Sequence, residues 1–214
     1  MKSYVSEFIG TALLLAIVAG SGLMGETLGA GNAAVALLGN SIATGAGLYV
    51  LITLLGPISG AHFNPVVTLM FWGLGNLDLR KMLGYWTCQF TGAITGIWVT
   101  HLMFSLPLIQ DSTKVRTGHG IWVSEFISTL ILLLVIRIGD QETKDRVPML
   151  VALTVTAGYW FTSSTFFANP AVALARSFTN TFVGIASKDV LEFVIAEVLA
   201  VLVIIVLLKK AKSF

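Results

Sequence analysis

Long apolar stretches are the feature that most constrains how this chain can fold. Six of them can be placed along the sequence, near 4–25, 33–55, 81–105, 120–139, 148–166 and 188–208. A helix needs roughly 20 apolar residues to cross the hydrocarbon core of a bilayer. Because lipid offers no water to hydrogen-bond an exposed backbone, only helices and closed barrels can span it. The stretches therefore predict an all-α membrane protein with six spans.

The composition supports this prediction and argues against several other classes. Charged residues make up 11% of the 214 residues, whereas soluble domains carry about 25%. A formal net charge of +2 gives no indication of a nucleic-acid partner. The single cysteine, Cys88, excludes an internal disulfide, and the three histidines have no metal-ligand spacing. We also find no phosphate-binding loop and no nucleophile–base arrangement, so we expect no enzyme, no cofactor and no metal site.

The basic residues favour one orientation of the chain in the membrane. Lys and Arg are concentrated in the cytoplasmic loops of membrane proteins. With six spans and both termini cytoplasmic, nine of the thirteen basic residues lie on the cytoplasmic side, and the opposite orientation would reverse this ratio. We therefore predict a multi-pass protein of the inner cell membrane with cytoplasmic N- and C-termini. The nine residues are Lys2, Arg80, Lys81, Arg137, Lys144, Arg146, Lys209, Lys210 and Lys212.

Two further apolar segments, near 64–74 and 169–180, are too short to cross a bilayer. Segments of this length are typical of re-entrant or interfacial elements. Each begins with an Asn-Pro pair. Asparagine is a favoured helix N-cap, and proline is favoured at the first helical position because its missing N–H would be unpaired there anyway. We therefore predict two half-helices that begin abruptly at Asn64 and Asn169.

The two halves of the chain carry the same order of elements. The segment 6–15 recurs at 124–133 with seven identical positions of ten, and the Asn-Pro segment 64–69 recurs at 169–174. We therefore divide the single domain, 1–214, into a first repeat 1–106 and a second repeat 120–214, joined by an extracellular loop 107–119. Three spans in each repeat make the second repeat inverted in the membrane. Inverted repeats with broken helices place the functional site near the midplane.

The Asn-Pro segments resemble those of a known family, the aquaporins or major intrinsic proteins. Residues 59–66, Ser-Gly-Ala-His-Phe-Asn-Pro-Val, resemble the family's first signature loop, and residues 168–171, Ala-Asn-Pro-Ala, resemble the second. The resemblance covers nearly the whole chain. It implies six transmembrane helices plus two re-entrant half-helices, and a homotetramer in lipid with one pore per subunit. The implied pore-centre residues are Asn64, Pro65, Val66, Asn169, Pro170 and Ala171.

The sequence departs from the family at the outer constriction of the pore. An arginine normally follows the second signature triplet, and here that position is Val172. Spacing carries the other filter positions over to Thr44, Ala157 (with Gly158 as the alternative) and Phe166. This set has no fixed charge and implies a wider opening than a water channel has. Glycerol channels normally keep the arginine and follow it with an aspartate, so the chain looks closer to a divergent bacterial branch linked with arsenite and other metalloid hydroxides.

Four further polar residues have two interpretations each. Arg176 either lines the outer vestibule or satisfies carbonyl groups at a helix end. Glu7 and Glu125 lie inside predicted spans, where an ionisable group suggests a function such as proton coupling. Their matching positions in the repeat favour a different role, in which each accepts hydrogen bonds from the loop before a half-helix. His62 either responds to pH or supports its loop, and we favour support.

These observations predict a passive channel for water and small uncharged solutes, such as glycerol-like polyols, urea or metalloid hydroxides. A strict water channel is the nearest alternative. A secondary transporter with broken helices is a second alternative, and it would require a mobile gate. A structural membrane protein with a closed pore is a third.

Overall fold

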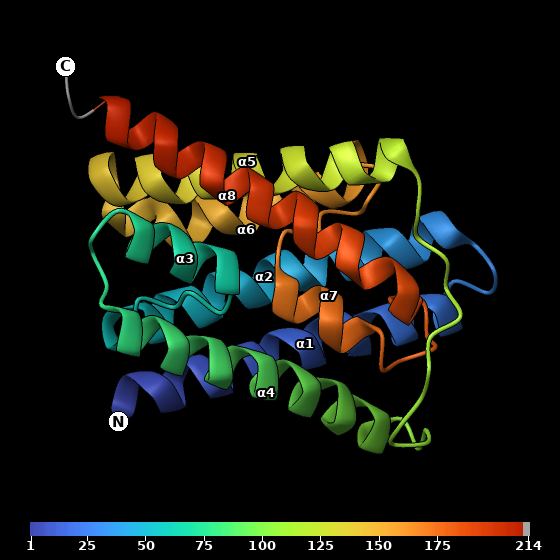
Figure 1. Ribbon diagram of the computed structural model, residues 1–214. Coiled ribbons are helices and arrows are strands. Elements are labelled where there is room, and N and C mark those ends of the chain that lie inside the picture. The colour runs from blue at the N-terminus through green and yellow to red at the C-terminus, as the bar shows by residue number, and fades with distance from the viewer. Residues whose placement is uncertain (212–214) are drawn as a thin grey trace.

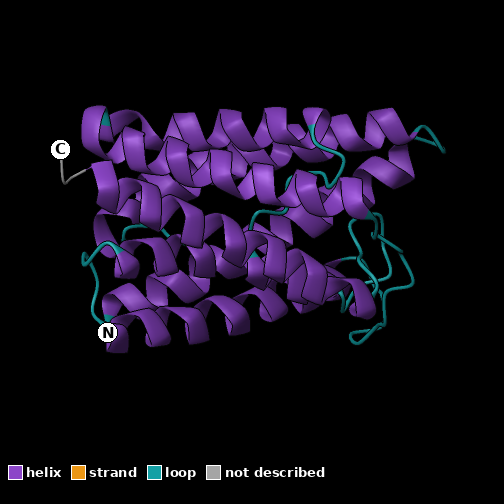
Figure 2. Ribbon diagram, turned by 45° about the horizontal axis from the view of Figure 1, so that its top comes forward, coloured by secondary structure: helices purple, strands orange, loops and turns teal. Residues whose placement is uncertain are grey.

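The computed structural model describes residues 1–211, and within this range the chain forms α-helices and short 3₁₀ turns without strands (Figures 1 and 2). Lys212, which was counted above with the cytoplasmic charges, and the last two residues of the second repeat lie outside the described residues. The eight α-helices are α1 (Lys2–Leu28), α2 (Ala33–Ser59), α3 (Pro65–Gly73), α4 (Leu79–Met103), α5 (His119–Glu142), α6 (Val147–Phe161), α7 (Pro170–Arg176) and α8 (Val190–Ala211).

Four segments are long and apolar enough to cross a membrane by themselves, namely α1, α2, α5 and the segment Ser187–Lys210. Helix α4 has 25 residues but carries buried polar side chains such as Gln89 and His101. Helix α6 has only 15 residues and is therefore about 22 Å long. The predicted span 148–166 is too long, because residues 162–166 form a loop.

The helices pack as two matching halves. Helix α1 packs against α2 and α4, and α5 packs against α6 and α8. Each half-helix contacts the last helix of both halves, since α3 lies against α4 and α8 and α7 lies against α8 and α4. The N-terminus and the end of α8 lie at one end of the bundle, and the long loop after α4 lies at the other end (Figure 1). The predicted half-helices are thus interior elements, held between the two repeats.

Helices α1 and α4 approach closely because glycines face the contact. A Cβ atom added at Gly92 would collide with the backbone of Phe8, and one added at Gly96 would collide with the carbonyl oxygen of Ala12. Small residues allow such close backbone contact between helices in membranes. This contact positions Gln89 of α4 next to α1, which matters for the site below.

Candidate functional site

Both half-helices begin at an asparagine N-cap. Asn64 precedes α3 and Asn169 precedes α7, each with an extended backbone. The Oδ1 atom of Asn64 accepts a hydrogen bond from the backbone N–H of Val66 at 3.0 Å, and that of Asn169 accepts one from Ala171 at 3.0 Å. The predicted starts of both half-helices are confirmed. The second half-helix is shorter than predicted, because α7 ends at Arg176 and not near residue 180.

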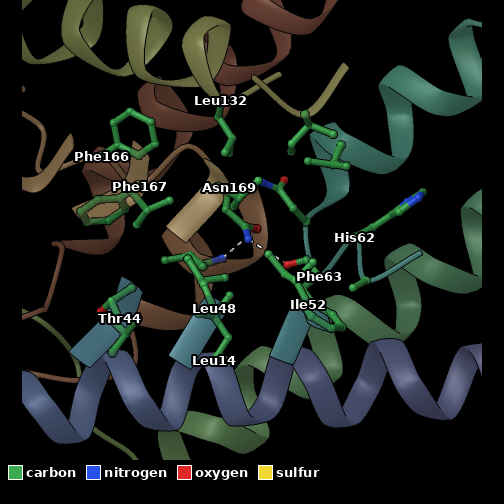
Figure 3. Close-up of a pocket in the computed structure, with 18 of the residues that line it drawn as sticks. Leu14, Thr44, Leu48, Ile52, His62, Phe63, Leu132, Phe166, Phe167 and Asn169 are labelled. Atoms are coloured by element: carbon green, nitrogen blue, oxygen red, sulfur yellow. Dashed lines mark hydrogen bonds between the residues drawn. The ribbon is translucent and has the colours of Figure 1, made fainter. Parts of the chain in front are cut away.

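The two asparagines are hydrogen-bonded to each other's loops. The Nδ2 atom of Asn64 donates to the carbonyl oxygen of Ala168 at 2.6 Å. The Nδ2 atom of Asn169 donates to the carbonyl oxygen of Phe63 at 2.8 Å (Figure 3). A carboxamide nitrogen carries two N–H groups. Each asparagine therefore holds the opposite loop with one N–H and keeps a second for other acceptors.

The loops before the asparagines repeat the same unusual backbone geometry. Phe63 and Ala168 directly precede the asparagines and both have φ of 47°. Ala61 and Phe166 lie three positions before them and have φ of 48° and 56°. Left-handed conformations of this kind cost roughly 1–3 kcal/mol for a non-glycine residue. The surrounding structure must therefore hold both loops in place.

Glu7 holds the first loop. Its side chain is fully buried and accepts four hydrogen bonds, two of them from the backbone N–H groups of His62 at 3.0 Å and Phe63 at 2.8 Å. The other two come from the hydroxyl of Ser59 at 2.6 Å and from Nε2 of Gln89 at 2.8 Å. Because four donors from the loop and its neighbours converge on one carboxyl group, the geometry agrees with loop support.

Two carboxyl groups hold the second loop. Glu125 of α5 accepts a hydrogen bond from the backbone N–H of Ala168, and Glu197 of α8 accepts one from Asn169 at 2.8 Å. Glu197 is fully buried and was not among the residues predicted from the sequence. Its signal was an acid more than one turn inside a long apolar helix, and an ionisable group at membrane depth is a functional candidate on its own.

Replacing Glu7 by alanine is expected to destabilise the protein by about 2–4 kcal/mol, because buried N–H groups of the loop lose their acceptor. Thermal unfolding in detergent measures this change. Glu26→Ala is the matched control, since Glu26 lies on the same helix but is exposed. Equal shifts in the two variants would contradict a supporting role for Glu7.

His62 lies in the first loop and is half-buried. Its Nδ1 atom is 3.0 Å from the hydroxyl oxygen of Thr68, and its ring stacks on Phe71 with a centroid distance of 4.9 Å. These contacts connect the loop to the following half-helix.

A cavity of about 130 Å³ runs past the two asparagines (Figure 3). Toward the end of the bundle that holds the termini it is lined by His62 and Asp140, and toward the opposite end by Thr44, Tyr159 and Arg176. Most of the wall between them is apolar, and that part includes Leu14, Val18, Leu48, Ile52, Leu132 and Val155. The two half-helix N-termini thus meet at an elongated, mostly apolar passage.

Val172 and Arg176 both contribute to the wall of the cavity from α7. The guanidinium of Arg176 lies over the ring of Phe167, 3.5 Å from its centroid, and its Nε donates to the carbonyl oxygen of Val183 in the following loop. The side chain is only 3% exposed. It therefore reaches the cavity from one turn beyond Val172.

The structure corrects one predicted filter position. Ala157 is exposed and does not line the cavity, whereas Val155 and Tyr159 do. Residues two apart on a helix point about 200° from each other, since a turn has 3.6 residues. Gly158, the alternative, packs against the ring of Phe166. Thr44, Phe166 and Val172 all line the cavity.

Tyr159 was missed in the sequence. Its hydroxyl oxygen lies 3.2 Å from that of Thr44, which joins α6 to α2 beside the cavity. A tyrosine in an apolar span has a polar tip that needs a partner, and this property was the available signal.

Half-helices that meet head to head inside a bundle of apolar helices, around an elongated cavity, define a membrane channel. A family model described as Major intrinsic protein matches residues 1–201, and the chain belongs to that family. It is 52% identical over 205 residues to the Aquaglyceroporin AqpS of Rhizobium meliloti (strain 1021), covering 96% of this chain and 88% of that protein. It is also 31% identical to a Probable glycerol uptake facilitator protein of Thermotoga maritima, over 72% of each chain.

Among solved structures, the aquaglyceroporin from Plasmodium falciparum matches with a TM-score of 0.73 at 23% identity, over 94% of this chain and 90% of that one. This match shows the fold. The predicted aquaporin-like fold is confirmed, and the chain is a multi-pass membrane channel of a family that passes water and small solutes.

Proposed function

We propose that this channel passes small uncharged solutes larger than water, of the polyol, urea and metalloid-hydroxide classes, together with water. The observation that supports this most directly is the lining of the cavity at the end opposite the termini. Val172 lines the cavity there, and by its place after the second signature triplet it corresponds to the filter arginine of most of the family. A valine is smaller and less polar than an arginine, so we expect a wider opening at that point. The relative from Rhizobium meliloti is named an aquaglyceroporin, which agrees with this class.

The wall at this end has one polar side and one apolar side. Thr44 and Tyr159 offer hydroxyl groups, and Arg176 offers guanidinium N–H groups one turn further out. Phe166 and Val172 offer apolar surface. A pocket of this kind orients a solute whose hydroxyl groups face one way and whose carbon or metalloid atom faces the other.

The centre of the cavity supports exclusion of cations. The N-termini of α3 and α7 meet there, and a helix N-terminus carries a partial positive charge. The free N–H of Asn64 and that of Asn169 can each donate to a passing oxygen atom. These two donors belong to the two signature triplets, which also contain Pro65, Val66, Pro170 and Ala171. We propose that the donor pair reorients passing water molecules and so interrupts a continuous proton wire. The positive ends of half-helices act in this way in selective pores.

The supporting residues complete this proposal. Glu7, Glu125 and His62 hold the loops that present the asparagines, and they are not coupled to solute movement.

We further propose a homotetramer in the inner membrane, with cytoplasmic termini and an extracellular loop 107–119. Large apolar side chains such as Leu54, Leu102 and Leu191 are exposed on the bundle, and such surfaces are covered by lipid or by neighbouring subunits.

Stopped-flow swelling of reconstituted vesicles tests the proposal. Vesicles with the protein are expected to take up glycerol, urea and arsenite faster than empty vesicles, down the gradient and independently of any ion gradient. Water flux without solute flux would establish the strict water channel instead. Uphill accumulation driven by an ion gradient would establish a transporter, and no flux at all would establish a closed structural protein.

A further inference from the structure

Glu125 and Glu197 form a buried acid pair that the channel function does not explain. Both side chains are 0% exposed, and they lie side by side, since they bind the backbone N–H groups of the adjacent residues Ala168 and Asn169. Each uses Oε1 to accept a backbone N–H of the second loop. As two carboxylates, both Oε2 atoms would be buried acceptors without a donor.

In the first repeat, a glutamine supplies the hydrogen-bond donor that the second carboxylate oxygen needs. Glu7 of α1 corresponds to Glu125 of α5, because both lie in the repeated segment of the first helix of their half. In the first half, Gln89 from the third spanning helix donates its Nε2–H to Oε2 of Glu7 at 2.8 Å. In the second half, Glu197 from α8 takes this place beside Glu125. A carboxylate cannot donate a hydrogen bond, whereas a carboxylic acid can.

Two guanidinium groups lie near the acid pair, but neither comes close enough to pair directly with it. Arg116 and Arg176 both attract Glu125 electrostatically. Neither guanidinium forms an ion pair with it, since Arg137 and Asp140 form the only pair within 4.0 Å among residues 1–211. Like charges in contact away from water cannot both remain ionised without a large penalty. One bound proton removes one charge and supplies the missing donor.

We propose that Glu197 is a proton-bearing positioning residue. Its carboxylic acid donates to the carboxylate of Glu125 while its other oxygen accepts the N–H of Asn169. The protonated pair then holds the loop that presents Asn169 to the cavity, as Gln89 and Glu7 hold the first loop. The proton is structural and is not moved with the solute.

Infrared spectroscopy of the reconstituted protein tests the proposal independently of transport. The wild type is expected to show the C=O stretch of a protonated carboxylic acid at neutral pH, and Glu197→Gln is expected to lose this band. Glu197→Gln should keep water flux within about twofold of wild type, because the amide supplies the same donor, whereas Glu197→Leu should lower it by roughly tenfold. Gln89→Glu, which builds the same acid pair in the first repeat, should add a second band.

The possible outcomes separate clearly. Absence of the band from the wild type, or its persistence in Glu197→Gln, would overturn the proposal. So would a Glu197→Gln variant that folds but transports as poorly as Glu197→Leu. If Glu197→Leu does not fold, the infrared comparison of wild type with Glu197→Gln and Gln89→Glu still decides. Failure of the proposed solute selectivity would leave these bands unchanged.

Discussion

Replacing Asn64 by alanine is expected to lower the flux of water and neutral solutes by at least about tenfold, since each 1.4 kcal/mol added to a barrier is a factor of ten. The variant removes three interactions together: the N-cap of α3, the bond from Nδ2 to the carbonyl oxygen of Ala168, and the N–H available to a solute. Loss of the N-cap costs about 1 kcal/mol. Leaving the carbonyl of Ala168 without a donor costs about 1–3 kcal/mol more.

Asn32, a helix-capping asparagine outside the pore, provides the matched control. Asn32 caps α2 and accepts hydrogen bonds from Ala34 and Val35, but it is exposed and contacts no part of the cavity around Asn64. Asn32→Ala therefore loses a cap without losing a donor at the pore centre. Swelling rates in vesicles, normalised to the amount of folded protein, compare the two variants. Similar rates in both would show that Asn64 acts only as a helix cap.

Replacing Val172 by arginine is expected to reduce glycerol and urea flux by roughly tenfold while reducing water flux much less. The new guanidinium would enter the cavity one turn before Arg176, about 6 Å away along the helix face. It would narrow the opening for larger solutes and add donors that a water molecule can use. The added bulk therefore acts more strongly on solutes than on water.

Val172→Met separates size from charge in this experiment. Methionine is long and flexible but uncharged, so it should narrow the opening without adding donors. We expect it to reduce glycerol flux less than arginine does. Equal loss of water and solute flux in Val172→Arg, or no loss of either, would contradict the assignment of Val172 to the constriction.

Short-range signals in the sequence were sufficient for the architecture and for part of the site. Apolar length predicts membrane helices, because the bilayer sets the number of residues needed. An Asn-Pro pair predicts an abrupt helix start, because both residues act within one turn. The matching acids Glu7 and Glu125 pointed to loop support through the repeat, and the hydrogen bonds of both to loop backbone agree with it.

The remaining features depend on contacts between distant segments. Whether Ala157 or Tyr159 faces the cavity depends on how α6 is rotated about its axis. The irregular loop 162–168 lies between α6 and Asn169, so counting residues back from Asn169 does not specify which face of α6 a residue occupies. The partnership of Glu197 with Glu125 exists only because α8 packs against α5. Residue spacing along the chain determines which side chains share a face of one helix. Which faces of different helices line the same cavity is determined by how all the helices pack together.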